Sequence, residues 1–476
     1  MTRYLRPAFV AVTLVFALDA STRPHLQAQS PSSLTGGAAL QAAYDAILDA
    51  RFDEMANVVA ETCPPAPTEA CRVIDALSVW WQIQLDPLSV ARDRLFQSRI
   101  ETAIAASEAW AAGEPTRAEA WFYVGGAYGA RAQWRVLRGQ RIGAARDGKR
   151  IKDALERALA LDPRLQEAYF GIGLYHYYAD VAPAAAKMLR WLLLLPGGDR
   201  KAGLQEMLRA RSAGALLRDE ADYQLQVIYL WYEKQPQRAL ELLAGLRQRH
   251  PRNPLFLQLI AEVQDQYLHD LNASLQTWLE LLEAAQARRV ASPSLAETRA
   301  RLGAALQLDR LFETDVAIEH IRAVIVADPS EPYGTRAQAQ LQLRRAVARM
   351  QDPAYRQSLE GWRALQRGDL AIAGRLLPQA LAARPDDPVT RLRNAQLLVA
   401  QSNDAAALAL LERILAARTT ASPTVYASAC LEAARVYERQ RATARAIDLY
   451  RAARGAFGAD PRTREAADRA LARLTL

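Results

Sequence analysis

Histidine, methionine and cysteine are scarce in this chain of 476 residues, which holds five, five and three of them. The zinc-peptidase motif H-E-x-x-H and the serine-hydrolase motif G-x-S-x-G are both missing, and no paired carboxylates recur at matching positions. The sequence therefore predicts no catalytic residue, no metal site and no cofactor, which is typical of a protein that is not an enzyme. An enzyme with a site near His176, with Asp180 one helical turn away as its partner, is the least favoured alternative.

Complete phosphate-binding loops are also missing. The stretch GDRKAG (198–203) has the two glycines of a P-loop, but Leu204 stands where the phosphate-binding lysine belongs. The pair Gly171 and Gly173 lacks the third glycine of a dinucleotide fingerprint. Nucleotide binding is excluded on these grounds.

Long apolar runs are confined to the N-terminus. Arg3 and Arg6 precede an apolar run at 8–18, and small residues follow at Ala20 and Ala28. Because that run is far shorter than the roughly 20 residues that span a bilayer, it indicates a cleaved signal peptide (1–28) rather than an anchor. A flexible tail (29–37) would follow, and the protein is expected to be exported to a periplasm, or secreted, and soluble after cleavage.

The three cysteines are interpreted in the light of export to an oxidising compartment. Cys63 and Cys71 flank the proline-rich loop TCPPAPTEAC, and a disulfide between them is expected to contribute roughly 2–3 kcal/mol. Two buried free thiols are the alternative. Cys430 lies inside a helical pattern and is expected to be a small core residue.

The formal charge of +8 falls to about +6 once residues 1–28 are removed. That excess is modest for the length, so nucleic acid is not expected as a partner.

A repeated spacing of small and large residues sets the fold class. Alanine, leucine, arginine and glutamine favour helix, and Trp121, Gly125 and Tyr128 recur in register as Tyr169, Gly173 and His176. A second pattern follows, with a small residue, a large one four residues later and a small or aliphatic one three after that. It is found at Ala239–Leu243–Leu246, Ala317–Ile321–Val324, Ala373–Leu377–Ala380 and Ala407–Leu411–Ile414.

These patterns resemble the tetratricopeptide repeat (TPR), a helix–turn–helix unit of about 34 residues. Steps of three and four keep one helical face apolar, and the small residues let the paired helix approach closely. The resemblance implies an all-α fold, a TPR α-solenoid in which helix pairs form a right-handed superhelix. We expect an N-terminal TPR-like array with inserted helices at 38–335 and a C-terminal TPR array at 336–476.

The TPR resemblance also implies a concave groove lined by helix A positions. Carried onto this chain, those positions give a partner-binding stripe of Phe122, Phe170, Leu174, Tyr177, Tyr178, Gln224, Ile228, Trp231 and Tyr232. Packing between helices is the alternative role for the same side chains. Tyrosine and tryptophan with exposed polar edges suit an extended peptide or a glycan.

Arginines gather after the Trp121 motif. Arg131, Arg135 and Arg138 recur at helical spacing, and helix A is expected to run on into an insertion before a helix B at about 150–161. The arginines are either a solvated face with some ion pairs or an anion-binding stripe within 131–152 for an acidic partner, an anionic envelope polymer or lipid headgroups.

The stretch 169–207 also resembles the eukaryotic TPR family of mitochondrial outer-membrane and inclusion-clearance proteins. Phe170, Gly173, Pro183, Gly198 and Arg200 are among the residues that carry this likeness. The stretch contains two candidates for helix B, an apolar helix at 183–195 and a later one with Gly203, Met207 and Ala210. We expect the later one to be helix B and the 183–195 helix to be an insertion that packs in the core rather than against a membrane.

The sequence as a whole indicates an exported, non-catalytic TPR scaffold that presents a concave surface to a protein or peptide partner. The alternative is a peripheral envelope assembly factor that touches lipid or anionic polymer through the 131–152 stripe and the 183–195 helix.

Overall fold

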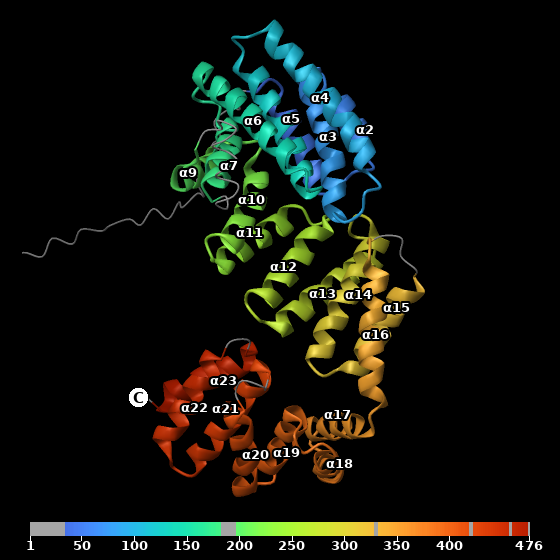
Figure 1. Ribbon diagram of the computed structural model, residues 1–476, viewed down its shortest axis with the longest axis vertical. Coiled ribbons are helices and arrows are strands. Elements are labelled where there is room, and N and C mark those ends of the chain that lie inside the picture. The colour runs from blue at the N-terminus through green and yellow to red at the C-terminus, as the bar shows by residue number, and fades with distance from the viewer. Residues whose placement is uncertain (1–33, 182–196, 328–331, 418–421, 457–458, 475–476) are drawn as a thin grey trace, which may run out of the picture. The chain divides into compact units, whose positions relative to one another are not determined.

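The computed structural model describes residues 34–181, 197–327, 332–417, 422–456 and 459–474. Within these ranges all regular structure is helical, in 22 helices (Figure 1). The predicted signal peptide and the predicted 183–195 helix lie outside the described residues.

The first half of the described chain contains the helices α1 (Gly37–Leu48), α2 (Met55–Thr62), α3 (Thr68–Leu85), α4 (Asp93–Gly113), α5 (Ala118–Leu137), α6 (Arg141–Leu161), α7 (Ala168–Val181), α9 (Arg200–Ala213), α10 (Arg218–Trp231), α11 (Pro236–Arg249) and α12 (Pro254–Gln266). The second half contains α13 (Leu271–Gln286), α14 (Pro293–Arg310), α15 (Thr314–Val326), α16 (Thr335–Gln351), α17 (Pro353–Gln366), α18 (Leu370–Ala383), α19 (Pro388–Ala400), α20 (Asp404–Ala416), α21 (Pro423–Arg439), α22 (Thr443–Gly455) and α23 (Pro461–Leu474).

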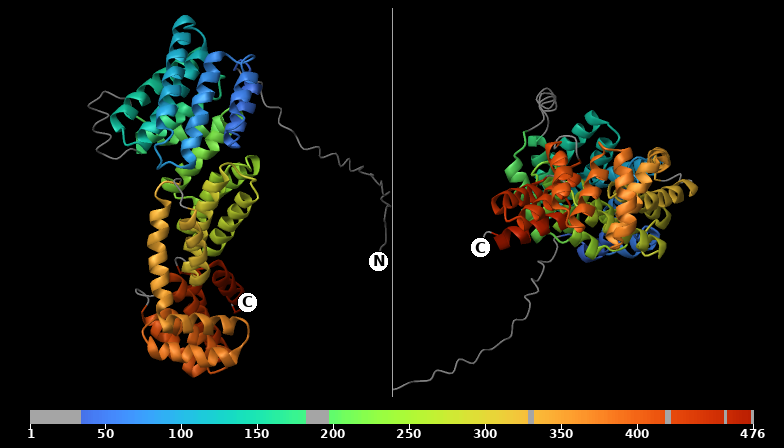
Figure 2. Two further views of the ribbon diagram at one scale, coloured as in Figure 1. Left: turned by 90° about the vertical axis from the view of Figure 1, so that its right-hand side faces the viewer. Right: turned by 90° about the horizontal axis from the view of Figure 1, so that it is seen from below.

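Helices that follow one another along the chain pack side by side, as Figure 2 shows from two further directions. Many of these helices begin with a capping residue or a proline, residue types that separate one helix from the next. Asp352, Asp369 and Asp387 each cap the following helix by accepting a hydrogen bond from its first backbone N–H groups. Proline occupies the first turn of α11, α12, α14, α17, α19 and α21, where its missing N–H costs nothing.

Small residues set the closest approach within a helix pair. A Cβ atom on Gly173 of α7 would lie 2.7 Å from the carbonyl oxygen of Gly203 on α9, and one on Gly203 would lie 2.6 Å from that of Gly173. The two backbones therefore meet at a contact that no other residue type fits. The prediction that the helix with Gly203, Met207 and Ala210 is helix B is confirmed.

The same pairing joins α5 to α6, α17 to α18, α19 to α20 and α21 to α22. The repeat positions Ala373, Leu377, Ala407, Leu411 and Ala446 are all fully buried in these pairs. The predicted fold class is confirmed: the chain is an all-α solenoid of tetratricopeptide-type helix pairs.

The first region of the chain, from α1 to α12, closes on itself. Its core runs from Leu34 to Val263, and α1 and α3 make contacts with residues 142 to 205 positions later in the chain. Asn253 donates a hydrogen bond from Nδ2 to the carbonyl oxygen of Leu48 (2.7 Å), and the Tyr44 hydroxyl donates to Glu220 (2.8 Å). The Trp81 ring on α3 lies 4.8 Å from that of Tyr223 on α10, measured between centroids. The inner side of the first region is therefore filled by its own N-terminal helices.

Two expectations about boundaries are wrong. The described part of the tail predicted at 29–37 is held in the fold, because Leu34 is buried and the Thr35 backbone N–H donates to Glu119 (2.7 Å). The insertion predicted before a helix B at about 150 is instead the first half of that helix, since α6 begins at Arg141. α5 and α6 are simply long, and Arg138 at the end of α5 makes contacts that a shorter helix would lack.

The cysteine predictions are confirmed. A disulfide joins Cys63 to Cys71 across the connection between α2 and α3, and Cys430 is fully buried in α21. The predicted array boundary between 335 and 336 falls at the start of α16 and stays a prediction. No described helix combines the length and the apolar character needed to cross a bilayer.

Candidate functional site

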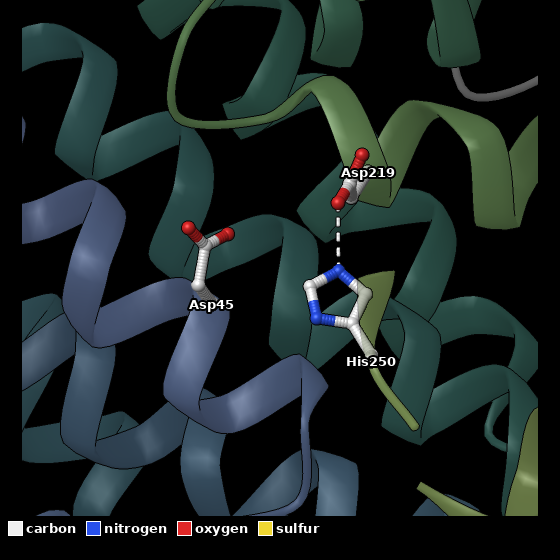
Figure 3. A group of neighbouring side chains, drawn as sticks. All are labelled: Asp45, Asp219 and His250. Carbon is white, nitrogen blue, oxygen red and sulfur yellow. Dashed lines mark hydrogen bonds and ion pairs between the residues drawn. The ribbon is translucent and has the colours of Figure 1, made fainter. Parts of the chain in front are cut away.

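A histidine and two carboxylates meet at the closure of the first region (Figure 3). Asp45 belongs to α1, Asp219 to the first turn of α10, and His250 follows the last residue of α11, with candidate ligand atoms within 4.8 Å of one another. His250 Nε2 lies 2.6 Å from Asp219 Oδ2. Three sequence-distant elements thus bring together residues of the types that bind metal.

Arg249 also belongs to this cluster and helps to determine the charge state of Asp219. Arg249 donates from Nε to Asp219 (2.9 Å) and from Nη2 to Asp222 (2.7 Å). Burial raises the pKa of Asp219, but the hydrogen bonds from His250 and Arg249 outweigh it, and the net pKa is lowered. Asp219 is therefore ionised, and the His250 Nε2–H donates to it.

A divalent cation does not fit this arrangement. It would have to displace the proton shared between His250 and Asp219 and would face the positive charge of Arg249. The cluster is better understood as a buried link between α1, α10 and α11, and we propose no metal site there.

Glu220 lies beside the cluster but in a different electrostatic setting. It is buried, with the Tyr44 hydroxyl and the Gln224 amide donating to it (2.8 and 3.1 Å) and no ion-pair partner among the described residues. Burial raises its pKa, in contrast to the lowered pKa of the adjacent Asp219. The pKa values of two neighbouring carboxyl groups on α10 are thus shifted in opposite directions.

Tyrosines form a second candidate site near the ends of α7 and α10. The rings of Tyr177, Tyr178 and Tyr232 meet edge to face, with each pair of centroids 5.8 Å apart. The Tyr177 hydroxyl donates to Glu233 (2.5 Å), which also accepts from Arg200 Nε (2.9 Å). This aromatic cluster therefore has the ion pair of Arg200 and Glu233 beside Tyr177.

The nine predicted groove residues differ in how far their side chains are exposed. Phe122, Phe170, Tyr177, Gln224 and Ile228 are buried, Leu174, Tyr178 and Tyr232 are half-buried, and Trp231 is 59% exposed. The buried members make contacts inside the protein, an example being Gln224, whose amide donates to Glu220 on α10 and to Gln133 on α5. A partner-binding role for the stripe stays a prediction, and the accessible part of it is centred on Trp231.

The three arginines of the predicted anion stripe are engaged within the protein. Arg131 pairs with Asp147 and Glu101, Arg135 pairs with Asp147, and Arg138 pairs with Asp93. Their charges are therefore compensated, and the stripe does not favour an external anion. The acids on α4 carry no sequence signal, because Glu101 and Asp93 lie 30 and 45 positions before the arginines they meet.

His176 is also engaged in packing. Its Nδ1 lies 2.8 Å from Glu206 Oε2 on α9, so its described partner differs from the predicted Asp180. The pair joins α7 to α9 beside the Gly173–Gly203 contact. This placement gives His176 a structural role.

Arg393 is a polar residue that sequence reasoning missed. It is only 3% exposed, lies between the rings of Phe312 and Trp362 (5.3 and 5.0 Å to the centroids), and donates to the Ser358 hydroxyl (3.0 Å). Among the described residues no carboxylate pairs with it, and burial lowers its pKa to about 10. Two aromatic faces, from Trp362 on α17 and from Phe312 in the turn between α14 and α15, thus replace the usual counter-ion.

No family model and no curated protein matches the chain. Among solved structures it is similar to the TPR2AB domain of yeast Sti1 in a pHSP90 complex, at 14% identity and a TM-score of 0.24, covering 54% of this chain and 99% of that one. It is also similar to the TPR domain of P58(IPK), at 14% identity and a TM-score of 0.27, covering 85% and 98%. A third is yeast Tom70, at 12% identity and a TM-score of 0.29, covering 92% and 95%. At such scores these similarities say nothing of a ligand, and the fold assignment rests on the helix pairs of this chain.

Proposed function

We propose that this chain is a non-enzymatic scaffold that binds a protein or peptide partner at the exposed end of α10. The observation that carries the proposal is Trp231, a large ring exposed beside the packed tyrosine cluster. Tryptophan and tyrosine are enriched among the residues that dominate interface energies, because each combines a large apolar ring with a polar edge. The binding surface is defined by Leu174, Tyr178, Trp231 and Tyr232.

The charges around this surface indicate what a partner offers. Glu233 is held by Arg200 and Tyr177, and burial of the Tyr177 side chain together with Glu233 raises the tyrosine pKa, so the hydroxyl stays protonated. A partner segment with an apolar or aromatic side chain fits against the Trp231 ring, and its backbone polar groups can reach the charged pair.

The proposed location is a periplasm or the cell exterior after cleavage of residues 1–28. It is supported by the basic and apolar pattern of the N-terminus and by the disulfide, which persists in oxidising compartments. Lipid or polymer contact through Arg131, Arg135 and Arg138 is not favoured, because these three arginines pair with carboxylates of the protein itself.

A photo-crosslinking residue at position 231 tests the proposal. Crosslinked proteins are identified by mass spectrometry, produced in pure form, and their affinity is measured against the Trp231→Ala variant. We expect affinity to fall about tenfold or more, while unfolding free energy changes by less than about 0.5 kcal/mol. Val326→Ala, which changes a side chain that is 84% exposed on α15, is the matched control and should bind as the wild type does. Equal affinities of Trp231→Ala and wild type would reject the Trp231 surface.

A further inference from the structure

Exposed aliphatic side chains gather at one end of the α3–α6 helices. Leu88, Val90, Val136 and Ile142 are 66%, 67%, 66% and 55% exposed, and Leu95 is 46% exposed. We name these five residues the loop-tip patch. They make up five of the twelve exposed large hydrophobic residues in the described part of the chain, which spans more than 400 positions. Such a concentration differs from the single exposed aliphatics that any surface carries.

Arg138 brings the two halves of the patch together. It follows α5, and its guanidinium donates to the carbonyl oxygens of Pro87 and Ser89 (2.6 and 2.7 Å) and to both carboxylate oxygens of Asp93 (2.6 and 2.8 Å). These four bonds fasten the α3–α4 connection against the α5–α6 turn. Leu88 and Val90 in the α3–α4 connection are consequently held near Val136 of α5 and Ile142 of α6, and the helices α3 to α6 lie side by side (Figure 1).

A tyrosine borders the patch. The Tyr333 backbone N–H donates to Asp86 (2.9 Å), two positions before Leu88, and its side chain is 63% exposed. Tyrosine has an apolar ring and a polar tip, a combination that favours the boundary between water and an apolar phase.

The charge of the patch is positive. Asp86 is buried and paired with Arg299, and Asp93 is paired with Arg138, so both nearby carboxylates are compensated. Arg94 and Arg141 are exposed, and in the described part of the chain neither has an ion-pair partner. The surface therefore combines aliphatic side chains with uncompensated guanidinium groups.

We propose that the loop-tip patch docks on an anionic phospholipid surface. The aliphatic side chains project from loop and helix ends instead of lining a groove, so they suit shallow insertion among acyl chains better than the grip of a peptide. Arg94 and Arg141 supply attraction to acidic headgroups, and Tyr333 sits at the level of the interface. This docking is independent of the partner surface at Trp231.

Flotation of the full chain with vesicles tests the proposal. Vesicles of phosphatidylcholine alone are compared with vesicles of phosphatidylcholine and phosphatidylglycerol, at low and at physiological salt. We expect binding to the anionic vesicles that weakens with salt, and about a tenfold or greater loss of partitioning in Arg94→Gln/Arg141→Gln. Leu88→Ser/Val90→Ser should also lose partitioning, without a change in circular dichroism or thermal midpoint, because both side chains are exposed.

Arg344→Gln/Arg345→Gln is the matched charge control, since it removes two exposed arginines of α16 and should float as the wild type does. All variants share residues 1–33, so differences between them report on the patch and not on the N-terminal apolar run. Equal flotation of wild type and both patch variants would overturn the proposal. So would vesicle-independent self-association that disappears in Leu88→Ser/Val90→Ser, because the patch would then belong to an interface between copies of the chain.

Discussion

The region from α1 to α12 and the region from α17 to α23 are both built from helix pairs, but their hydrophobic cores differ in extent. In the first, one core joins Leu34 to Val263. In the second, the cores are small and join helices that are near neighbours in sequence, and a groove of about 490 Å³ lies open between α18, α19 and α20. The second region therefore keeps a groove between neighbouring helices, whereas in the first region the N-terminal helices α1 and α3 join a core that extends to α12.

Trp81→Ala is expected to have the largest effect, a loss of stability in the first region. Trp81 is 1% exposed and packs on Tyr223 and Phe256, so its removal is expected to cost about 3–5 kcal/mol of unfolding free energy. Amide hydrogen exchange in α10 and α12 should accelerate together with that in α3, because one core holds all three. Urea unfolding followed by exchange mass spectrometry measures both effects.

Tyr450→Ala is the counterpart in the second region. Tyr450 is 2% exposed and bonds Glu438, and its loss should accelerate exchange in α21 to α23 only. Unchanged exchange of α10 and α12 in Trp81→Ala would show that the closure does not stabilise the first region.

Reduction of the Cys63–Cys71 disulfide is expected to have the next largest effect. The bond closes a loop of eight residues, and the chain-entropy estimate for that length is roughly 2–3 kcal/mol. The first region should therefore unfold at lower urea when reductant is present, and the second region should not respond. The Cys63→Ser/Cys71→Ser variant should be insensitive to reductant, and a reductant effect in that variant would point to another cause.

The smallest expected effect is on the pH dependence of stability, to which Glu220 and Asp219 of α10 contribute with opposite signs. The raised pKa of Glu220 makes its contribution to stability fully present below the unfolded pKa and lost as pH rises through the folded pKa. Glu220→Gln keeps an acceptor for Tyr44 and has no proton to lose, so its stability should decline less over that rise. The lowered pKa of Asp219 gives the opposite sign, with stability present above the unfolded pKa and lost as pH falls through the folded pKa.

Urea midpoints over a pH series measure these slopes. Asp219→Asn should be destabilised near neutral pH, because His250 and Arg249 then lack their charged acceptor. Identical slopes for wild type and Glu220→Gln would contradict the role given to Glu220.

The helix pairs could be predicted from the sequence because their signals are local. Gly203, Met207 and Ala210 carry the spacing of helix B within a single helix, and the structure places all three at the buried contact with α7. The closure of the first region could not be predicted, because Leu48 and Asn253 meet through a backbone carbonyl and an amide 205 positions apart.

The same distinction between local signals and long-range contacts applies to the candidate sites. The stripe that contains Trp231 follows from repeat register, whereas the burial of Gln224 and Ile228 depends on helices from elsewhere in the chain. The arginine stripe was visible as a spacing, but its partners Asp93 and Glu101 lie on another helix. Tertiary contacts of this kind leave no periodic trace in one sequence.

The long-range bonds of α1 also bear on the order of synthesis and folding. The Leu48 carbonyl receives the amide of Asn253, and Asp49 accepts from the backbone of Arg252, so neither contact exists until the ribosome has passed α11. Pairs such as α5 with α6 form between neighbours and need no such delay. In the first region, the helix that is translated first is therefore the last to be fixed in place.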